Sequence, residues 1–181
     1  MRISIHQPNL CPHFGFFYKM SQSDVMVMLT QVQFEKNGYQ NRYFLQGKQK
    51  WVTKPVCSGL EPIHAKHYID GENLADLNIQ FIDWARRVLS IKTQIVMDVA
   101  SNNRSTQRLI DNLNFYGGTV YITNPSAKDK YLDEQMIRDA GIDIEYSDCP
   151  NAKLNILEMF ETFGIDGTKK QLWKPKKVAV E

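Results

Sequence analysis

The first 30 residues constrain the fold most strongly, because a strand, a stiff loop, a helix and a second strand follow one another without a break. The β-branched run 3–5 turns into polar residues and prolines, and an aromatic run with helical spacing follows over 14–21. Residues 24–29, which are apolar after Asp24, predict a second, fully buried strand. Because a helix lies between them, the two strands are expected to be parallel. The chain therefore starts with a βαβ unit.

The same alternation continues towards the carboxyl terminus. Helices are predicted over 74–89, 103–115, 131–140 and 154–163, and strands over 93–97, 120–122 and 142–146. We therefore expect a single α/β domain over 1–168, with a mainly parallel sheet covered by helices, as in Rossmann-like and nucleotidylyltransferase-like folds. Residues 41–53 predict a small antiparallel hairpin, and residues 169–181 a basic tail.

Composition places the chain among ordinary globular proteins. With 181 residues, of which 43% are hydrophobic, it can bury one sizeable core. A formal net charge of +2 is too small to indicate a partner. Three scattered cysteines, and His64 and His67 without a third ligand, indicate no metal site. Because neither a secretion signal nor an apolar run near the ~20 residues of a membrane span is present, we expect a cytoplasmic protein without a membrane partner.

Polar residues follow the first predicted strand. His6, Gln7 and Asn9 stand just beyond it, and Pro8 and Pro12 stiffen the loop that carries them. Ligands of open α/β sheets bind beyond the carboxyl ends of the strands, so these three side chains are candidate ligand contacts. The alternative is an ordinary connection whose polar residues only cap the next helix.

A second polar group follows the second predicted strand and contains Lys36, Asn41 and Arg42. If the two strands are neighbours, both groups meet at one sheet edge. There Arg42 could contact a phosphate in a bidentate manner and Lys36 could act as a point charge. The alternative is that both cations are solvated surface residues.

Two further regions each allow two interpretations. Ser105 and Thr106 open a predicted helix, where such residues bind anions or simply serve as N-caps. Lys130, before the next helix, allows the same two interpretations. The tail pairs five lysines with Trp173, which suits either a nucleic-acid backbone with a stacked base or a solvated terminus.

The loop before the first helix has a partial nucleotide-binding pattern. Residues 12–16, PHFGF, are similar to the H-x-G-H turn of nucleotidylyltransferases, in which both histidines hold triphosphate. His13 is present, but Phe16 replaces the second histidine. We therefore do not expect nucleotidyl transfer, and His13 stays a candidate substrate contact.

Several segments, in order, resemble the WbqC-like protein family. They are IHQPN (5–9) with FYK (17–19), QVQF (31–34) running to QNR (40–42), WVTKPV (51–56), STQRLI (105–110), YLD (131–133) and LNILEM (154–159). These segments cover nearly the whole chain. The sequence departs from the family at residues 11–13, where members usually have an apolar residue, Pro and Trp. The stretch between His67 and Leu74 is also much shorter than in typical members.

The resemblance implies a group transferase that acts on a phosphate-activated acceptor. Family members occur in surface-polysaccharide (O-antigen) gene clusters and in phage pathways that attach amino acids to 5-hydroxymethyl-pyrimidines in DNA. The compact form and the lysine-rich tail favour DNA. The expected partners are thus DNA with an activated pyrimidine, such as hydroxymethyluracil, and a free amino acid such as glycine. The alternatives are aminoacyl or acyl transfer to a nucleotide-linked aminosugar, and a non-catalytic nucleic-acid-binding module.

Roles for single residues follow from that implied reaction, in which the amine of an amino acid displaces pyrophosphate from the activated methylene. His6 is the candidate general base because histidine titrates near neutral pH. Lys36 and Arg42, with Lys19, are the candidate clamp for the leaving group. Phe34 and Tyr39 are candidates for stacking an extrahelical base. No cofactor is expected. The other candidate substrate contacts are Gln7, Asn9, His13, Gln33, Asn41, Ser105, Thr106 and Lys130.

Overall fold

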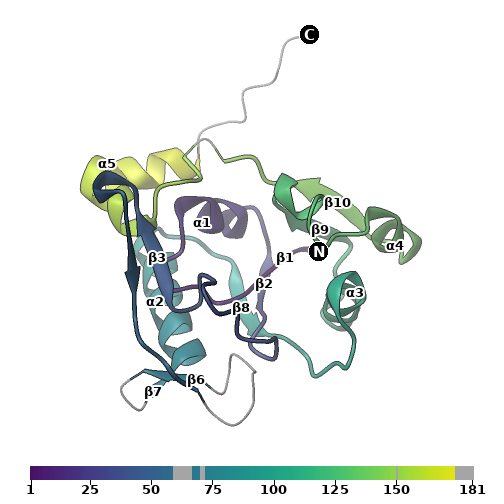
Figure 1. Cartoon of the computed structure of the whole chain (residues 1–181). Coiled ribbons are helices and arrows are strands. Elements are labelled where there is room, and N and C mark those ends of the chain that lie inside the picture. The colour runs from purple at the N-terminus through teal and green to yellow at the C-terminus, as the bar shows by residue number, and fades with distance from the viewer. Residues whose placement is uncertain (59–66, 70–71, 150, 174–181) are drawn as a thin grey trace.

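A five-stranded parallel sheet lies at the centre of the computed structural model, which describes residues 1–58, 67–69, 72–149 and 151–173 (Figure 1). The strands are ordered β10–β9–β1–β2–β8, and every neighbouring pair is parallel. This confirms the predicted α/β class with a mainly parallel sheet. The strands are β1 (Arg2–His6), β2 (Val25–Met28), β8 (Gln94–Met97), β9 (Val120–Thr123) and β10 (Asp143–Tyr146).

Helices cover both faces of the sheet, because the side chains of each strand alternate between two cores. Met26 and Met28 pack with α1, α2 and α5 on one face, whereas Val25 and Val27 pack with α3 and α4 on the other. All four residues of β2 are therefore buried, as expected for a strand covered on both sides. The helices are α1 (Phe14–Ser21), α2 (Leu74–Val88), α3 (Ser105–Phe115), α4 (Glu134–Asp139) and α5 (Ile156–Leu172).

Capping side chains fix where three of these helices begin. Asn73 caps α2, and Asn155 forms a capping box with Glu158 at the start of α5. Asp133 accepts a hydrogen bond from the Met136 N–H, so α4 begins after residue 133 rather than at 131 as predicted. None of the helices in the described ranges is both long and apolar enough to cross a membrane.

The last helix is longer than predicted. It bends at Gly164, whose φ of 67° is the left-handed conformation that glycine tolerates, and then continues to Leu172. The expected boundary between residues 168 and 169 therefore lies inside α5, and Lys169 and Lys170 are helical. Residues 174–181 of the tail lie outside the described residues.

Two small antiparallel units stand apart from the central sheet. The predicted hairpin is confirmed as β3 (Arg42–Leu45) and β4 (Lys50–Thr53), joined by the turn η1 (Gln46–Lys48). The second unit contains β5 (Cys57–Ser58), β6 (His67–Ile69) and β7 (Glu72–Asn73). His64 lies outside the described residues, and a short turn, η3 (Pro125–Ala127), follows β9.

β1 is the strand at which the order of the sheet reverses. It pairs with β2 on one side and with β9 on the other. The chain leaves these strands towards opposite faces, and in open α/β sheets the resulting crevice at the carboxyl ends is where ligands bind. His6 is the last residue of β1.

Candidate active site

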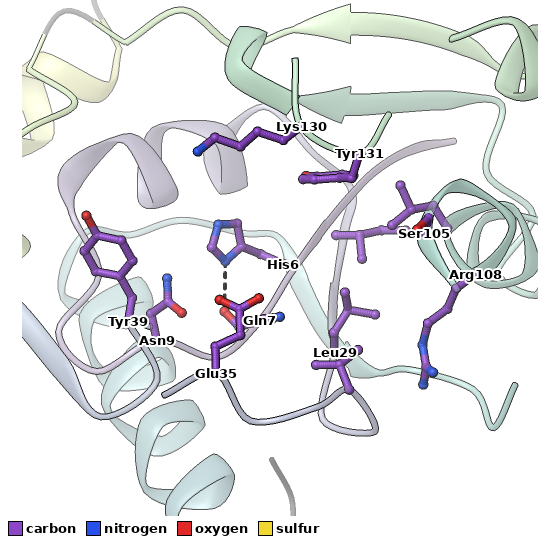
Figure 2. A pocket seen from close by; sticks show the side chains of 13 residues that line it. His6, Gln7, Asn9, Leu29, Glu35, Tyr39, Ser105, Arg108, Lys130 and Tyr131 are labelled. Atoms are coloured by element: carbon purple, nitrogen blue, oxygen red, sulfur yellow. Dashed lines mark hydrogen bonds between the residues drawn. The ribbon is translucent and has the colours of Figure 1, made fainter. Parts of the chain in front are cut away.

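A cavity of about 550 Å³ opens at the carboxyl end of β1 (Figure 2). Its volume lies within the range of sites for small ligands. The walls come from the end of β1, from the long connection after β2, from the first turn of α3 and from the loop before α4. The lining residues are Ile5, His6, Gln7, Asn9, Leu29, Val32, Glu35, Tyr39, Ser105, Arg108, Leu109, Lys130 and Tyr131.

His6 is held in one orientation by its neighbours. Its Nδ1 lies 2.9 Å from the Gln7 carbonyl oxygen, so this nitrogen carries the proton and donates a hydrogen bond. The ring also packs edge-on against Phe16, with 5.1 Å between ring centroids. The other ring nitrogen, Nε2, points away from the carbonyl, towards the side of Lys130 in Figure 2. Nε2 is therefore left as the proton acceptor of a ring that lines the cavity.

Burial keeps the His6 ring neutral. Desolvation, with smaller effects from the charges of Lys19 and His13, lowers the pKa of His6 to about 3. A base is most effective when its pKa is near the working pH, so His6 is a weak base in the ligand-free protein. A phosphate bound beside the ring would raise this pKa, because an anion favours the imidazolium form.

Because the pKa of His6 is lowered in the folded protein, we expect the free energy of unfolding to fall in acid. Between pH 6.5 and 3 the unfolded chain protonates His6 whereas the folded chain does not, so protons favour unfolding. The free energy of unfolding should fall by up to about 3 kcal/mol between pH 6.5 and 4 on account of this group. Denaturant unfolding of His6→Gln over this range should show a shallower pH dependence than the wild type. Equal slopes would contradict the burial of a neutral His6.

Lys19 lies beneath the site rather than in it. The side chain is 2% exposed, and Nζ donates a 3.1 Å hydrogen bond to the Ile5 carbonyl. Burial lowers the pKa of Lys19 to about 7. We expected Lys19 in the leaving-group clamp, but the structure places it in the packing between α1 and β1, where it braces the end of the strand.

Hydrogen bonds hold the polar loop after β1 in place against the rest of the fold. Gln7 Oε1 accepts a 2.7 Å bond from Gln40 Nε2. The buried Asn78 amide donates to the carbonyls of both Pro8 and Gln40, at 2.9 and 2.8 Å. Asn9 is 6% exposed and lines the cavity. The loop is therefore fixed by tertiary partners as well as by its prolines.

One buried carboxylate organises the α3 wall of the cavity. The Asp98 side chain is fully buried and pairs with Arg108, with 2.9 Å between Nη2 and Oδ2. Asp98 also accepts hydrogen bonds from the Thr30 N–H and hydroxyl and from the Gln31 N–H. Asp98 thereby ties Arg108 to the segment that follows β2.

Ser105 and Thr106, adjacent in the sequence, have different surroundings. Ser105 is exposed and lines the cavity. Thr106 is buried, and its hydroxyl donates to the Tyr131 carbonyl and accepts from the Asp133 N–H, both at 2.9 Å. Thr106 therefore fastens the loop that carries Lys130 and Tyr131.

The second predicted polar group does not reach His6. The Arg42 guanidinium stacks on Trp51, 4.1 Å from the ring centroid, and donates to the Asn37 carbonyl. Asn41 is buried, and its amide donates a 2.8 Å bond to the Lys54 carbonyl. Lys36 is exposed and lines neither the 550 Å³ cavity nor a smaller cavity of about 370 Å³ that His6 also lines. The physical reason is that β3 forms a separate hairpin, so residues leading into it turn away from the sheet edge.

Gln33 lies near the site but outside the main cavity. It borders an adjoining surface depression together with residues 101–105 and Arg108. Of the two aromatics expected to stack a base, Tyr39 lines the main cavity and Phe34 does not.

A second cavity, of about 370 Å³, shares His6 and Asn9 with the first. It is bordered by the first turn of α1 and by the segments that follow β9 and β10. His13 lines it and packs edge-on against Tyr39, with 5.1 Å between ring centroids, and burial lowers the pKa of His13. The other lining residues are Gly15, Phe16, Asn124, Pro125, Ser126, Ser147, Asp148, Cys149 and Ala152.

Comparison with family models identifies the kind of protein. The model of the WbqC-like protein family matches residues 7–67 and 56–154, which together cover most of the 181 residues. The chain belongs to the WbqC-like family. Membership indicates a transferase-related role. No curated protein and no solved structure matched the chain.

Several site residues of this WbqC-like protein had not been singled out from the sequence as candidates. Arg108 stands one helical turn after Ser105, and this spacing was the available signal that both face one cavity. Tyr131, Ser147 and Asp148 follow no such pattern and come to the site through the fold. Among the described residues, no group of three His, Cys, Asp or Glu side chains could hold a metal ion.

Proposed function

We propose that this WbqC-like protein is a transferase that binds its donor and the reacting part of its acceptor on two sides of His6. The observation that carries the proposal is that His6 lines both cavities at the carboxyl end of β1. A transferase of this kind must hold a donor and an acceptor on two sides of the group that moves a proton. Asn9, the other shared residue, is placed to orient either ligand.

The larger cavity suits a phosphate-bearing acceptor with a flat ring. Lys130 is exposed at its rim and makes no ion pair within the described part of the chain, and Arg108 lines the same cavity. Such cations stabilise the charge that develops on a leaving phosphate. Tyr39 and Tyr131 supply aromatic surfaces for a base. These residues take the clamp role that the sequence had suggested for Lys19, Lys36 and Arg42.

The proposed reaction attaches an amino acid to a pyrophosphorylated 5-hydroxymethyl-pyrimidine in DNA. His6 Nε2 takes a proton from the ammonium, and the freed amine attacks the methylene carbon. A C–N bond forms, the C–O bond to pyrophosphate breaks, and pyrophosphate leaves with the electron pair. Binding of the anionic acceptor raises the His6 pKa, so the base gains strength when both ligands are present.

A nucleotide-linked aminosugar is the second candidate acceptor. One observation favours it: Lys169 and Lys170 lie on α5, and neither lines either cavity. Because these two lysines do not line the site, they do not by themselves favour a DNA backbone as the ligand. The reaction would then be aminoacyl or acyl transfer to the sugar amine.

A product assay separates these functions. The protein is incubated with an oligonucleotide that carries pyrophosphorylated hydroxymethyluracil and with a set of free amino acids, and mass gain and released pyrophosphate are measured. A parallel reaction supplies a nucleotide-linked aminosugar and an acyl thioester. Product from the second reaction alone would contradict the DNA reaction and support transfer to an aminosugar in polysaccharide synthesis. Salt-sensitive DNA binding without any product would indicate a non-catalytic binding module.

Lys130→Ala should raise the KM for the phosphate-bearing acceptor about 10- to 100-fold, the usual size of a charged hydrogen bond. Lys128→Ala is the matched control, because Lys128 stands two residues away but pairs with Glu134, at 3.0 Å, outside the cavity. Steady-state kinetics with varied acceptor provide the measurement. Equal KM values for the two variants would remove Lys130 from the acceptor site.

A further inference from the structure

The smaller cavity has a positive pole at the start of α1. His13 precedes this eight-residue helix and makes no side-chain capping hydrogen bond. The Phe14 N–H donates to the Leu154 carbonyl and the Phe16 N–H to the His13 carbonyl, whereas the Gly15 N–H has no partner among the described residues. Helix starts carry a partial positive charge and attract anions. The first turn of α1 therefore offers a place for a negative group.

A buried hydroxyl marks the same cavity as a ligand site. Ser147 is 3% exposed, and its Oγ has no hydrogen-bond partner among the described residues. Leaving such a group unpaired costs about 1–3 kcal/mol, so buried hydroxyls normally have partners. Ser147 lines the cavity, so a bound polar ligand could supply the hydrogen bond that its Oγ lacks among the described residues.

The residue after Ser147 brings a negative charge to the same cavity. Asp148 lines the cavity, is exposed, and makes no ion pair with the described residues. Its carboxylate suits an ammonium group. The cavity thus combines an anion site and a cation site within a space of about 370 Å³, and it reaches His6.

We propose that this cavity binds the zwitterion of a free α-amino acid. The carboxylate of the ligand lies at the first turn of α1 and the Ser147 hydroxyl, and its ammonium lies at Asp148. The inference rests on the proposed function for one step only, namely that the bound amino acid is the donor whose amine faces His6. The binding itself requires no acceptor.

Binding is therefore measured on the full chain without DNA or nucleotide. Glycine, L-alanine, L-serine and L-glutamate are titrated separately and followed by protein NMR, with Gly15 and Ser147 amide signals as reporters. At least one amino acid should bind in a saturable way. Its amide derivative, which lacks the carboxylate, and its N-acetyl derivative, which lacks the ammonium, should each bind at least tenfold more weakly. Absence of saturable binding by all four amino acids would overturn the inference.

Matched variants locate the site. Asp148→Asn and Ser147→Ala should each weaken amino-acid binding about tenfold or more. Asp143→Asn, at the opposite end of β10, should leave it unchanged. Equal affinities for Asp148→Asn and Asp143→Asn would overturn the site. Amino-acid binding at these residues without transfer to any acceptor would leave this inference standing and would reject the proposed function.

Discussion

His6→Gln is expected to lower kcat by about 10²- to 10⁴-fold, the usual contribution of a general base. Glutamine keeps a hydrogen-bonding side chain at the end of β1 but cannot accept a proton near neutral pH. The loss should appear in kcat more than in KM, because both cavities keep their other walls. Circular dichroism at pH 7 should show an intact fold.

The pH dependence distinguishes a base from a positioning residue. The pH profile of kcat/KM reports the free enzyme, in which the His6 pKa is about 3, and the profile of kcat reports the ligand-bound enzyme. The acid limb of the kcat profile should therefore lie at higher pH than that of kcat/KM, and His6→Gln should abolish it. Unchanged kcat in His6→Gln would exclude His6 as the base. Glu35, which lines the same cavity, or the departing phosphate would then be the proton acceptor.

Asp98→Asn should destabilise the protein by about 3–5 kcal/mol, because it removes one partner of a buried ion pair and leaves the other charge uncompensated. The Asp98 side chain is fully buried and that of Arg108 is 12% exposed, so the pair is largely shielded from water. Asparagine keeps one oxygen for the Thr30 and Gln31 donors, so the charge is the main difference. Urea unfolding gives the change in free energy.

Asp83→Asn is the control for this substitution. Asp83 bridges Arg86 and Arg87 on α2, but its side chain is 27% exposed and that of Arg87 is 74% exposed. Pairs at the surface contribute up to about 1 kcal/mol. Similar losses for Asp83→Asn and Asp98→Asn would contradict the organising role of Asp98.

The fold was predictable from local patterns, whereas the order of its strands was not. Apolar runs and helix periods located every strand of the central sheet, because those signals depend on near neighbours in the chain. The pairing of β1 with β9 joins residues more than 100 positions apart. No periodicity encodes that choice, since several orders would bury the same runs.

The same distinction between local and distant information applies to the site. The position of His6, Gln7 and Asn9 at the cavity was predictable, because they directly follow a strand whose end must be a sheet edge. Lys36 and Arg42 were misplaced because the argument assumed that residues after β2 stay at that edge, and the hairpin carries them away. Lys19 was expected in the leaving-group clamp, but α1 is buried on nearly every side, and a single lysine in the sequence does not reveal this.

The attachment of the Lys130–Tyr131 loop has a consequence for how this family can diversify. The floor of the larger cavity is the end of β1 and cannot change without disturbing both cores. Its opposite wall is an exposed loop that the Thr106 hydroxyl fastens to α3. Loops on a rigid scaffold accept sequence change readily. Substitutions at residues 128–131 can therefore reshape this wall of the larger cavity while His6 and the smaller cavity stay unchanged.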